Sequence, residues 1–122
     1  MSGNKYLADT NVFIYLLDKH PALQPLLESE WMFSFITEIE LLGKKDIFAE
    51  EIKNVQEVLL VCKKVAHIEK LNELTILLKR KYRIKLPDAL IAATAINENI
   101  PLLTFDTDFL KIKELDLVLL EP

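Results

Sequence analysis

The chain has 122 residues, a length typical of one compact domain, and a formal net charge of −4. Hydrophobic residues make up 51% and charged residues 28%, with only 2 glycines and 5 prolines, which excludes disordered and collagen-like chains. The negative charge argues against binding of nucleic acid through a broad positive potential. We therefore expect residues 1–122 to form a single folded domain.

The apolar runs are all shorter than the roughly 18 to 20 residues that a bilayer crossing needs. Residues 1–6 also lack the apolar stretch of a signal peptide, so we expect a cytoplasmic protein without a membrane segment. The single cysteine, Cys62, cannot form an internal disulfide. It occupies an apolar position of a helical pattern, which predicts a buried core thiol.

The first half of the chain alternates strand-like and helix-like patterns. Apolar residues at spacings of three and four, such as Ile52, Val55 and Leu59, predict an amphipathic helix. In chain order, the predicted elements are a strand at 5–8, a helix at 10–18, a helical turn from Pro21 through Glu28, a strand at 31–36, a short helix from Thr37 to Gly43 and a helix from Phe48 to Cys62.

The second half continues the alternation. Its predicted elements are a strand at 64–68, a helix marked by Ile68, Leu71, Leu74 and Leu78, a helix opened by Pro87, a strand at 100–105, a short helix at 107–112 and a last strand at 115–120. Such alternation predicts an α/β fold with a parallel sheet covered on both faces. Right-handed crossovers would place every strand-to-helix junction at one edge, where open α/β sheets bind their ligands.

Four carboxylates stand at these junctions or in the first turns of predicted helices: Asp9, Glu40, Asp88 and Asp106. Each could simply cap a helix, and residues 37–40 fit a capping box in which the glutamate reaches back to the threonine. The predicted topology brings at least Asp9, Glu40 and Asp106 to the same side of the sheet, however, and helix capping does not require this. Because clustered carboxylates repel one another, a divalent cation such as Mg²⁺ or Mn²⁺ would stabilise them.

A basic segment, residues 79–85 with the sequence KRKYRIK, interrupts the acidic character of the chain. Its cations are Lys79, Arg80, Lys81, Arg83 and Lys85. They could form a solvated helix end whose positive charge suits the helix dipole, or they could contact phosphates. In the second interpretation, a metal lies over the acids and a nucleic acid backbone lies along the cations.

Four stretches, LADTNVFIYLL, SFITEIELLG, KLPDALIAATAI and LLTFDTDFLKI, follow one another over nearly the whole chain. Together they resemble the four acidic motifs of PIN-domain ribonucleases, and especially those of the VapC-like toxins of bacterial toxin–antitoxin pairs. The order and separation of four motifs are far more specific than an isolated D-T-N. This resemblance implies a three-layer α/β/α sandwich with a mostly parallel central sheet.

The same resemblance implies a catalytic and metal-binding role for four acids. Asp9 and Asp88 would be the main Mg²⁺ ligands, and Glu40 and Asp106 would complete the site, either directly or through water. Glu38 lies two positions from Glu40, hence roughly 200° around a helix, so both cannot face one metal. We choose Glu40 because it is the acid of the T-x-x-E-L stretch.

Supporting roles follow from the resemblance as well. Thr10 and Asn11 would support Asp9, and Thr104 would support the end of the fourth strand. Asp108 is a further candidate, since family members vary in the acids that follow that strand. Gly43 comes one residue earlier than is usual in the family, which affects the expected loop there.

The function implied is that of a Mg²⁺-dependent endoribonuclease that hydrolyses RNA and leaves a 5′-phosphate. The implied partners are an RNA substrate, a small antitoxin protein and a second copy of the chain in a homodimer. One alternative is a receiver-like phospho-accepting signalling domain, although the chain lacks the adjacent acid pair and the late strand-end lysine of that class. Another is a catalytically inactive binding module with the PIN fold.

Overall fold

A five-stranded sheet forms the centre of the computed structural model, which describes residues 4–122. The strand order is β3-β2-β1-β4-β5, and all four strand pairings are parallel. The strands are β1 (Lys5–Ala8), β2 (Glu30–Ser34), β3 (Lys63–Val65), β4 (Leu102–Thr104) and β5 (Leu117–Leu119). The predicted parallel sheet is therefore confirmed, and most strands are shorter than their apolar patterns.

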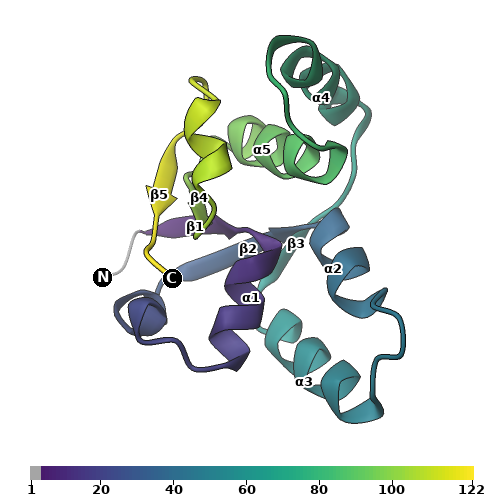
Figure 1. Cartoon of the computed structure of the whole chain (residues 1–122), viewed down its shortest axis with the longest axis vertical. Coiled ribbons are helices and arrows are strands. Elements are labelled where there is room, and N and C mark those ends of the chain that lie inside the picture. Colours follow the sequence, from purple (N-terminus) through teal and green to yellow (C-terminus); the bar gives the residue numbers. More distant parts are fainter. Residues whose placement is uncertain (1–3) are drawn as a thin grey trace.

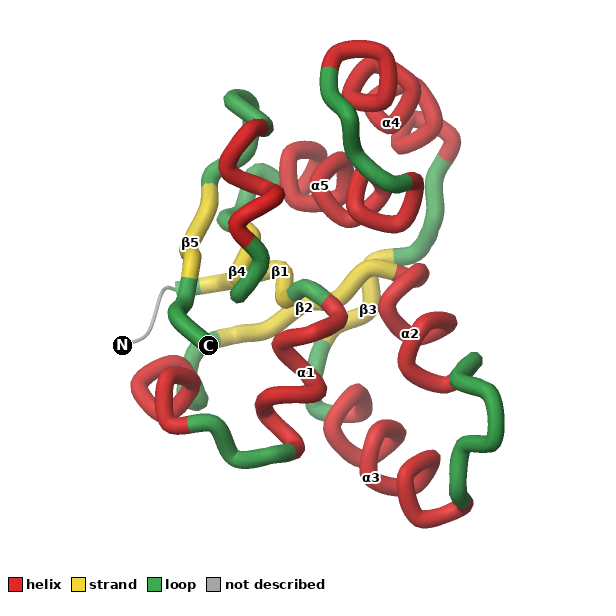
Figure 2. The backbone as a smooth tube through the Cα atoms, in the orientation of Figure 1, coloured by secondary structure: helices red, strands yellow, loops and turns green. Residues whose placement is uncertain are grey.

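Helices cover both faces of this sheet, which confirms the three-layer α/β/α sandwich (Figures 1 and 2). On one face lie α4 and α5, and on the other lie α1, α3 and the first short 3₁₀ helix, with α2 beside β3. The helices are α1 (Thr10–Leu17), α2 (Phe35–Leu42), α3 (Ala49–Leu60), α4 (Glu69–Lys81), α5 (Leu86–Glu98) and the 3₁₀ helices Pro21–Leu26 and Thr107–Lys111. None of the helices within residues 4–122 has the length and apolar character needed to cross a membrane.

Each face of the sheet has its own apolar cluster. Leu7 and Leu102 belong to the cluster under α4 and α5, whereas their chain neighbours Ala8 and Leu103 belong to the cluster under α1 and α3. This alternation follows from the two-residue period of a strand. Because both faces are covered, the strands appear in the sequence as continuous apolar runs.

The strand order creates a switch point between β1 and β4. From the central β1 the chain continues outward through β2 and β3, then crosses the other face to β4 on the opposite side of β1. The carboxyl ends of β1 and β4 are consequently adjacent, and the Asp9 backbone N–H donates to the Leu103 carbonyl at 3.0 Å. In open α/β sheets this is the position where ligands bind.

The boundary between β2 and α2 differs from the prediction. β2 ends at Ser34 and α2 begins at Phe35, so a strand at 31–36 and a helix from Thr37 are both wrong. The Ser34 hydroxyl caps α2 by accepting from the Ile36 N–H at 3.2 Å. The capping box expected at residues 37–40 is therefore absent, because Thr37 already lies inside the helix.

Cys62 also differs from its expected setting. It is half-buried and lies in the turn between α3, which ends at Leu60, and β3. The helix cannot extend further because Lys63 pairs with Met32 of β2. β3 itself is shorter than the predicted strand at 64–68, since its last partner, Ser34, is also the last residue of β2.

Candidate active site

Asp9 is the most buried of the predicted site acids and lies directly between β1 and α1. Only 4% of its surface is exposed. Its Oδ1 accepts from the Thr10 backbone N–H at 2.7 Å, and its Oδ2 accepts from the Thr104 hydroxyl at 2.8 Å. These two donors, from α1 and from the neighbouring β4, hold the carboxylate at the switch point.

The charge of Asp9 is unfavourable in this setting. Burial raises its pKa to about 6, hydrogen bonds from Thr104 and Thr10 work against this, and the carboxylates of Asp88 and Asp106 raise it further. A buried acid surrounded by other acids is stabilised either by a proton or by a cation.

Asp88 shares this environment from the first turn of α5. Burial raises its pKa, as do the nearby carboxylates of Asp106, Glu40 and Asp108, whereas the Lys85 ammonium lowers it. We refer to Asp9, Glu40, Asp88, Asp106 and Asp108 as the acidic cluster. Asp88 and Asp106 act electrostatically on Asp9, and Asp106, Glu40 and Asp108 act on Asp88, so acids from elements distant in the sequence lie within electrostatic range of one another.

Asp106 and Asp108 belong to the short segment after β4. Asp106 caps the second 3₁₀ helix by accepting from the Asp108 backbone N–H at 2.8 Å. Its own backbone N–H donates to the Thr104 hydroxyl at 3.0 Å. Thr104 thus connects Asp9 to the segment that contains Asp106. Asp106 therefore both caps a helix and belongs to the acidic cluster.

Glu40 reaches the cluster from α2. Its Oε1 accepts from the Thr10 hydroxyl at 2.6 Å, whereas Glu38 points elsewhere and forms an ion pair with Lys64 at 3.0 Å. The choice of Glu40 over Glu38 agrees with this geometry. Thr10 therefore contacts two acids, Asp9 through its backbone and Glu40 through its side chain.

Two side chains around the site differ from expectation. Asn11, expected to support Asp9, is exposed and has no side-chain hydrogen bond within residues 4–122. Thr37, expected only as a cap, is fully buried and lies with its hydroxyl 3.1 Å from that of Thr10. Its position one helical turn before Glu40 is the sequence signal that could have identified it.

The donor chemistry of the acidic cluster fits a hard divalent cation. Carboxylate oxygens are the ligands that Mg²⁺ and Mn²⁺ prefer. Burial raises the pKa values of Asp9 and Asp88, and neighbouring carboxylates raise both further, so a cation there would offset unfavourable negative charge. Within residues 4–122, no three side chains of the types Asp, Glu, His and Cys are arranged closely enough to enclose a metal. The agreement between the acidic cluster and a divalent cation therefore rests on the types of ligand atom and on the electrostatic repulsion among the carboxylates.

The basic segment is divided between structural and unengaged cations. Lys79 Nζ donates to the Ile84 carbonyl at 2.7 Å, and Lys81 Nζ pairs with Glu114 at 2.7 Å. The side chains of Arg80, Arg83 and Lys85 form no hydrogen bond or ion pair within the described part of the chain. Lys85 in addition lies near enough to Asp88 to lower the pKa of that acid.

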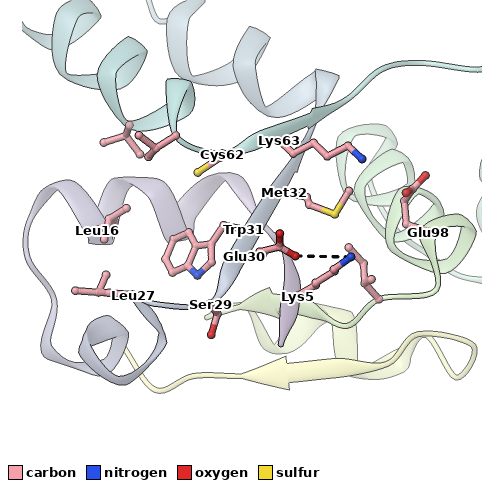
Figure 3. A pocket seen from close by; sticks show the side chains of 13 residues that line it. Lys5, Leu16, Leu27, Ser29, Glu30, Trp31, Met32, Cys62, Lys63 and Glu98 are labelled. Carbon is pink, nitrogen blue, oxygen red and sulfur yellow. Dashed lines mark ion pairs between the residues drawn. The ribbon is translucent and has the colours of Figure 1, made fainter. Parts of the chain in front are cut away.

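Two of the cavities in the described part of the chain lie at opposite ends of the strands. One, of about 610 Å³, adjoins the acidic cluster and is lined by Asn11, Tyr15, Phe105 and Asp106, among others. The other, of about 560 Å³, lies at the amino ends of the strands, where Trp31, Met32 and Cys62 are near the Lys5–Glu30 ion pair (Figure 3). Of these two, only the first is lined by a member of the acidic cluster, Asp106.

Comparison with solved structures gives extensive similarity. A chain of a toxin–antitoxin complex from Klebsiella pneumoniae is 28% identical, with a TM-score of 0.81 over 96% of this chain and 99% of that one. A chain of VapBC2 from Rickettsia felis, bound to a promoter DNA fragment, is 26% identical, with a TM-score of 0.76 over 93% and 97%. A chain of DNA-bound VapBC from Salmonella typhimurium, 19% identical with a TM-score of 0.83 over 94% and 97%, shares the fold.

Family membership follows from a separate comparison. None of the curated proteins compared with the chain matches it. The PIN domain model, however, matches residues 6–115, which include all four predicted acids. This match removes the receiver-like alternative and agrees with the resemblance to VapC-like proteins. The chain therefore belongs to the PIN domain family.

Proposed function

We propose that the chain is a cytoplasmic, Mg²⁺-dependent endoribonuclease that hydrolyses phosphodiester bonds in single-stranded or looped RNA. The observation that carries this proposal is Asp9, an acid at the switch point whose pKa is raised by burial and then further by the neighbouring carboxylates of Asp88 and Asp106. Membership of the PIN domain family and similarity to chains of toxin–antitoxin complexes support a nuclease toxin.

The acidic cluster has a defined part in this reaction. Asp9 and Asp88 would hold the cation, with Glu40 and Asp106 completing its surroundings. Mg²⁺ held by these residues would supply Lewis-acid chemistry, lowering the pKa of a water molecule and stabilising charge on phosphate. The water oxygen bonds to phosphorus as the bond to the 3′ oxygen breaks, leaving a 5′-phosphate and, after protonation, a 3′-hydroxyl. The Thr104 and Thr10 donors keep Asp9 in one orientation throughout.

Cleavage of a labelled single-stranded RNA tests the proposal. We expect the purified protein to cut this RNA with added Mg²⁺ or Mn²⁺ and to stop cutting in excess EDTA, because the acidic cluster repels phosphate without a cation. The new ends should carry 5′-phosphates. Full activity in EDTA, or cyclic phosphate ends, would contradict the proposal. RNA binding without cleavage under all metal conditions would instead favour the inactive PIN-fold module.

The unengaged cations of the basic segment should contribute to RNA affinity. We expect Arg83→Gln and Lys85→Gln each to raise the Kd for RNA several-fold at low salt. Each should also make the slope of the logarithm of the binding constant against the logarithm of the salt concentration shallower, by about 0.7 per lost phosphate contact. Binding curves measured over a range of KCl concentrations check this. The control is Lys53→Gln, on α3 and away from the basic segment. Equal salt slopes for all three variants would exclude a phosphate-contacting segment.

The proposed partners are an antitoxin and a second copy of the chain. Similarity to chains of toxin–antitoxin complexes supports a small antitoxin partner. Several large apolar side chains are also exposed, among them Ile39 at 59% and Phe48 at 73%, next to the loop between α2 and α3, and Leu77 at 57% on α4. Such surfaces are available for protein contacts, and light scattering of the purified chain would measure whether it forms the proposed homodimer.

A further inference from the structure

Thr37 presents a buried hydroxyl whose partner is another hydroxyl. Its side chain is fully buried on α2, and its Oγ1 lies 3.1 Å from Thr10 Oγ1. Within residues 4–122, this is the one hydrogen bond that the Thr37 side chain forms. Because a buried hydroxyl cannot turn to water, its orientation depends on Thr10.

The direction of the hydrogen bonds follows from the number of protons. Thr10 has one hydroxyl proton, and its oxygen lies 2.6 Å from Glu40 Oε1, a separation typical of a hydroxyl that donates to a carboxylate. An ionised Glu40 has no proton to give, so Thr10 donates to it. Thr37 must then donate to Thr10, and the two hydroxyls form a relay that ends on Glu40.

The relay joins two acids that come from different elements. Thr37 and Glu40 are three residues apart, so they lie on one face of α2. Thr10 begins α1, and its backbone N–H also holds Asp9 Oδ1 at 2.7 Å. Hydrogen bonds in such a chain polarise one another, so the Thr37 donor strengthens the bond from Thr10 to Glu40.

We propose that Thr37 is a positioning residue of the acidic cluster: acting through Thr10, it orients Glu40 toward the cation. This inference rests on the proposed function. Partners of this kind, which hold a ligand without touching the metal, commonly change metal affinity by about 10-fold to 100-fold when they are removed.

Mg²⁺ binding to the metal-free protein, measured by calorimetry, tests the proposal. We expect Thr37→Val, which keeps the side-chain shape and removes the hydroxyl, to raise the dissociation constant about 10-fold. Thr37→Ser keeps the hydroxyl and should restore most of the affinity. The matched control is Thr75→Val, since Thr75 is also a buried threonine but donates within α4 to the Leu71 carbonyl. Equal affinities for Thr37→Val and Thr75→Val would overturn the proposal.

A double-mutant cycle tests whether Thr37 acts through Thr10. Thr10→Val should weaken Mg²⁺ binding at least as much as Thr37→Val, and the double variant should bind like Thr10→Val alone, because the relay is already broken. Additive losses would show that Thr37 acts independently of Thr10, against the proposal. Thr37→Ala replaces Thr37→Val in the cycle if the valine variant does not fold.

A crystal structure of metal-free Thr37→Val decides the proposal separately from the function. We expect the contact between Thr10 Oγ1 and Glu40 Oε1 to lengthen and the Glu40 carboxylate to shift, whereas retention of the present 2.6 Å contact with Glu40 unmoved would overturn the relay. If the wild-type protein neither binds Mg²⁺ nor cleaves RNA, the proposed function fails, and this structure still tests the role of Thr37.

Discussion

Asp9→Asn and Asp88→Asn are each expected to lower kcat for RNA cleavage by about 10³-fold or more, since several kcal/mol of stabilisation by a metal corresponds to a factor of this size. Asparagine keeps the shape of aspartate, and at position 9 it can still accept from the Thr10 N–H, but it removes the negative charge that is proposed to hold the cation. Cleavage rates at saturating RNA and Mg²⁺ measure the effect, and circular dichroism checks that each variant is folded.

Asp116→Asn provides the matched control for this prediction. Asp116 is an exposed acid that immediately precedes β5, at the edge of the sheet opposite the acidic cluster. The same chemical change there should leave cleavage within about 2-fold of wild type, because surface substitutions away from a site are nearly neutral. An Asp9 or Asp88 variant that is as active as Asp116→Asn would exclude the proposed roles of these acids.

In the absence of metal, Asp9→Asn is expected to be more stable than the wild-type protein at neutral pH. The pKa of Asp9 is 3.8 in the unfolded chain and is raised to about 6 in the folded protein, so the folded state binds the proton of Asp9 more tightly. The stability contributed by this group is therefore lost as pH rises from about 4 through about 6. A pKa difference of about two units corresponds to about 3 kcal/mol in the free energy of unfolding.

Denaturant unfolding at about pH 4 and about pH 8 measures this difference in stability. We expect wild type and Asp9→Asn to differ little at the lower pH and by about 2 to 3 kcal/mol at the higher pH. Saturating Mg²⁺ should then stabilise the wild-type protein and leave Asp9→Asn nearly unchanged, because a ligand stabilises only the state that binds it. If the metal-free wild-type protein were more stable at pH 8 than metal-free Asp9→Asn, the charge of Asp9 would not oppose folding, and the prediction would be wrong.

Local patterns in the sequence predicted most of the architecture. The alternation of apolar strands with helices of period 3.6 was sufficient for a parallel sheet covered on both faces, and the first strand and the helix that Pro87 helps to open lie where expected. Element boundaries were less accurate. The end of β2 at Ser34 was missed because Phe35 and Ile36 are apolar and pack against the core from a helix as readily as from a strand.

The contacts within the candidate active site could be predicted only in part from the sequence. The types of side chain and their positions, after strands or in the first turns of predicted helices, indicated Asp9, Glu40, Asp88 and Asp106, since these properties are local. The resemblance assigned Thr10 to the support of Asp9 alone, whereas its hydroxyl in fact contacts Glu40. Thr37 was interpreted as a helix cap because its nearest polar partner, Thr10, is 27 positions away in the sequence.

Hydrophobic periodicity and side-chain type act over a few residues, and these local properties were enough to indicate which elements form and which acids lie near their ends. The folded structure alone places β4 beside β1, which brings the Thr104 hydroxyl to Asp9 across 95 positions of the chain. It likewise decided that α1 and α2 approach closely enough for Thr37, Thr10 and Glu40 to form one hydrogen-bonded relay. Strand order and helix approach depend on the packing of the whole core, which no short stretch of sequence specifies.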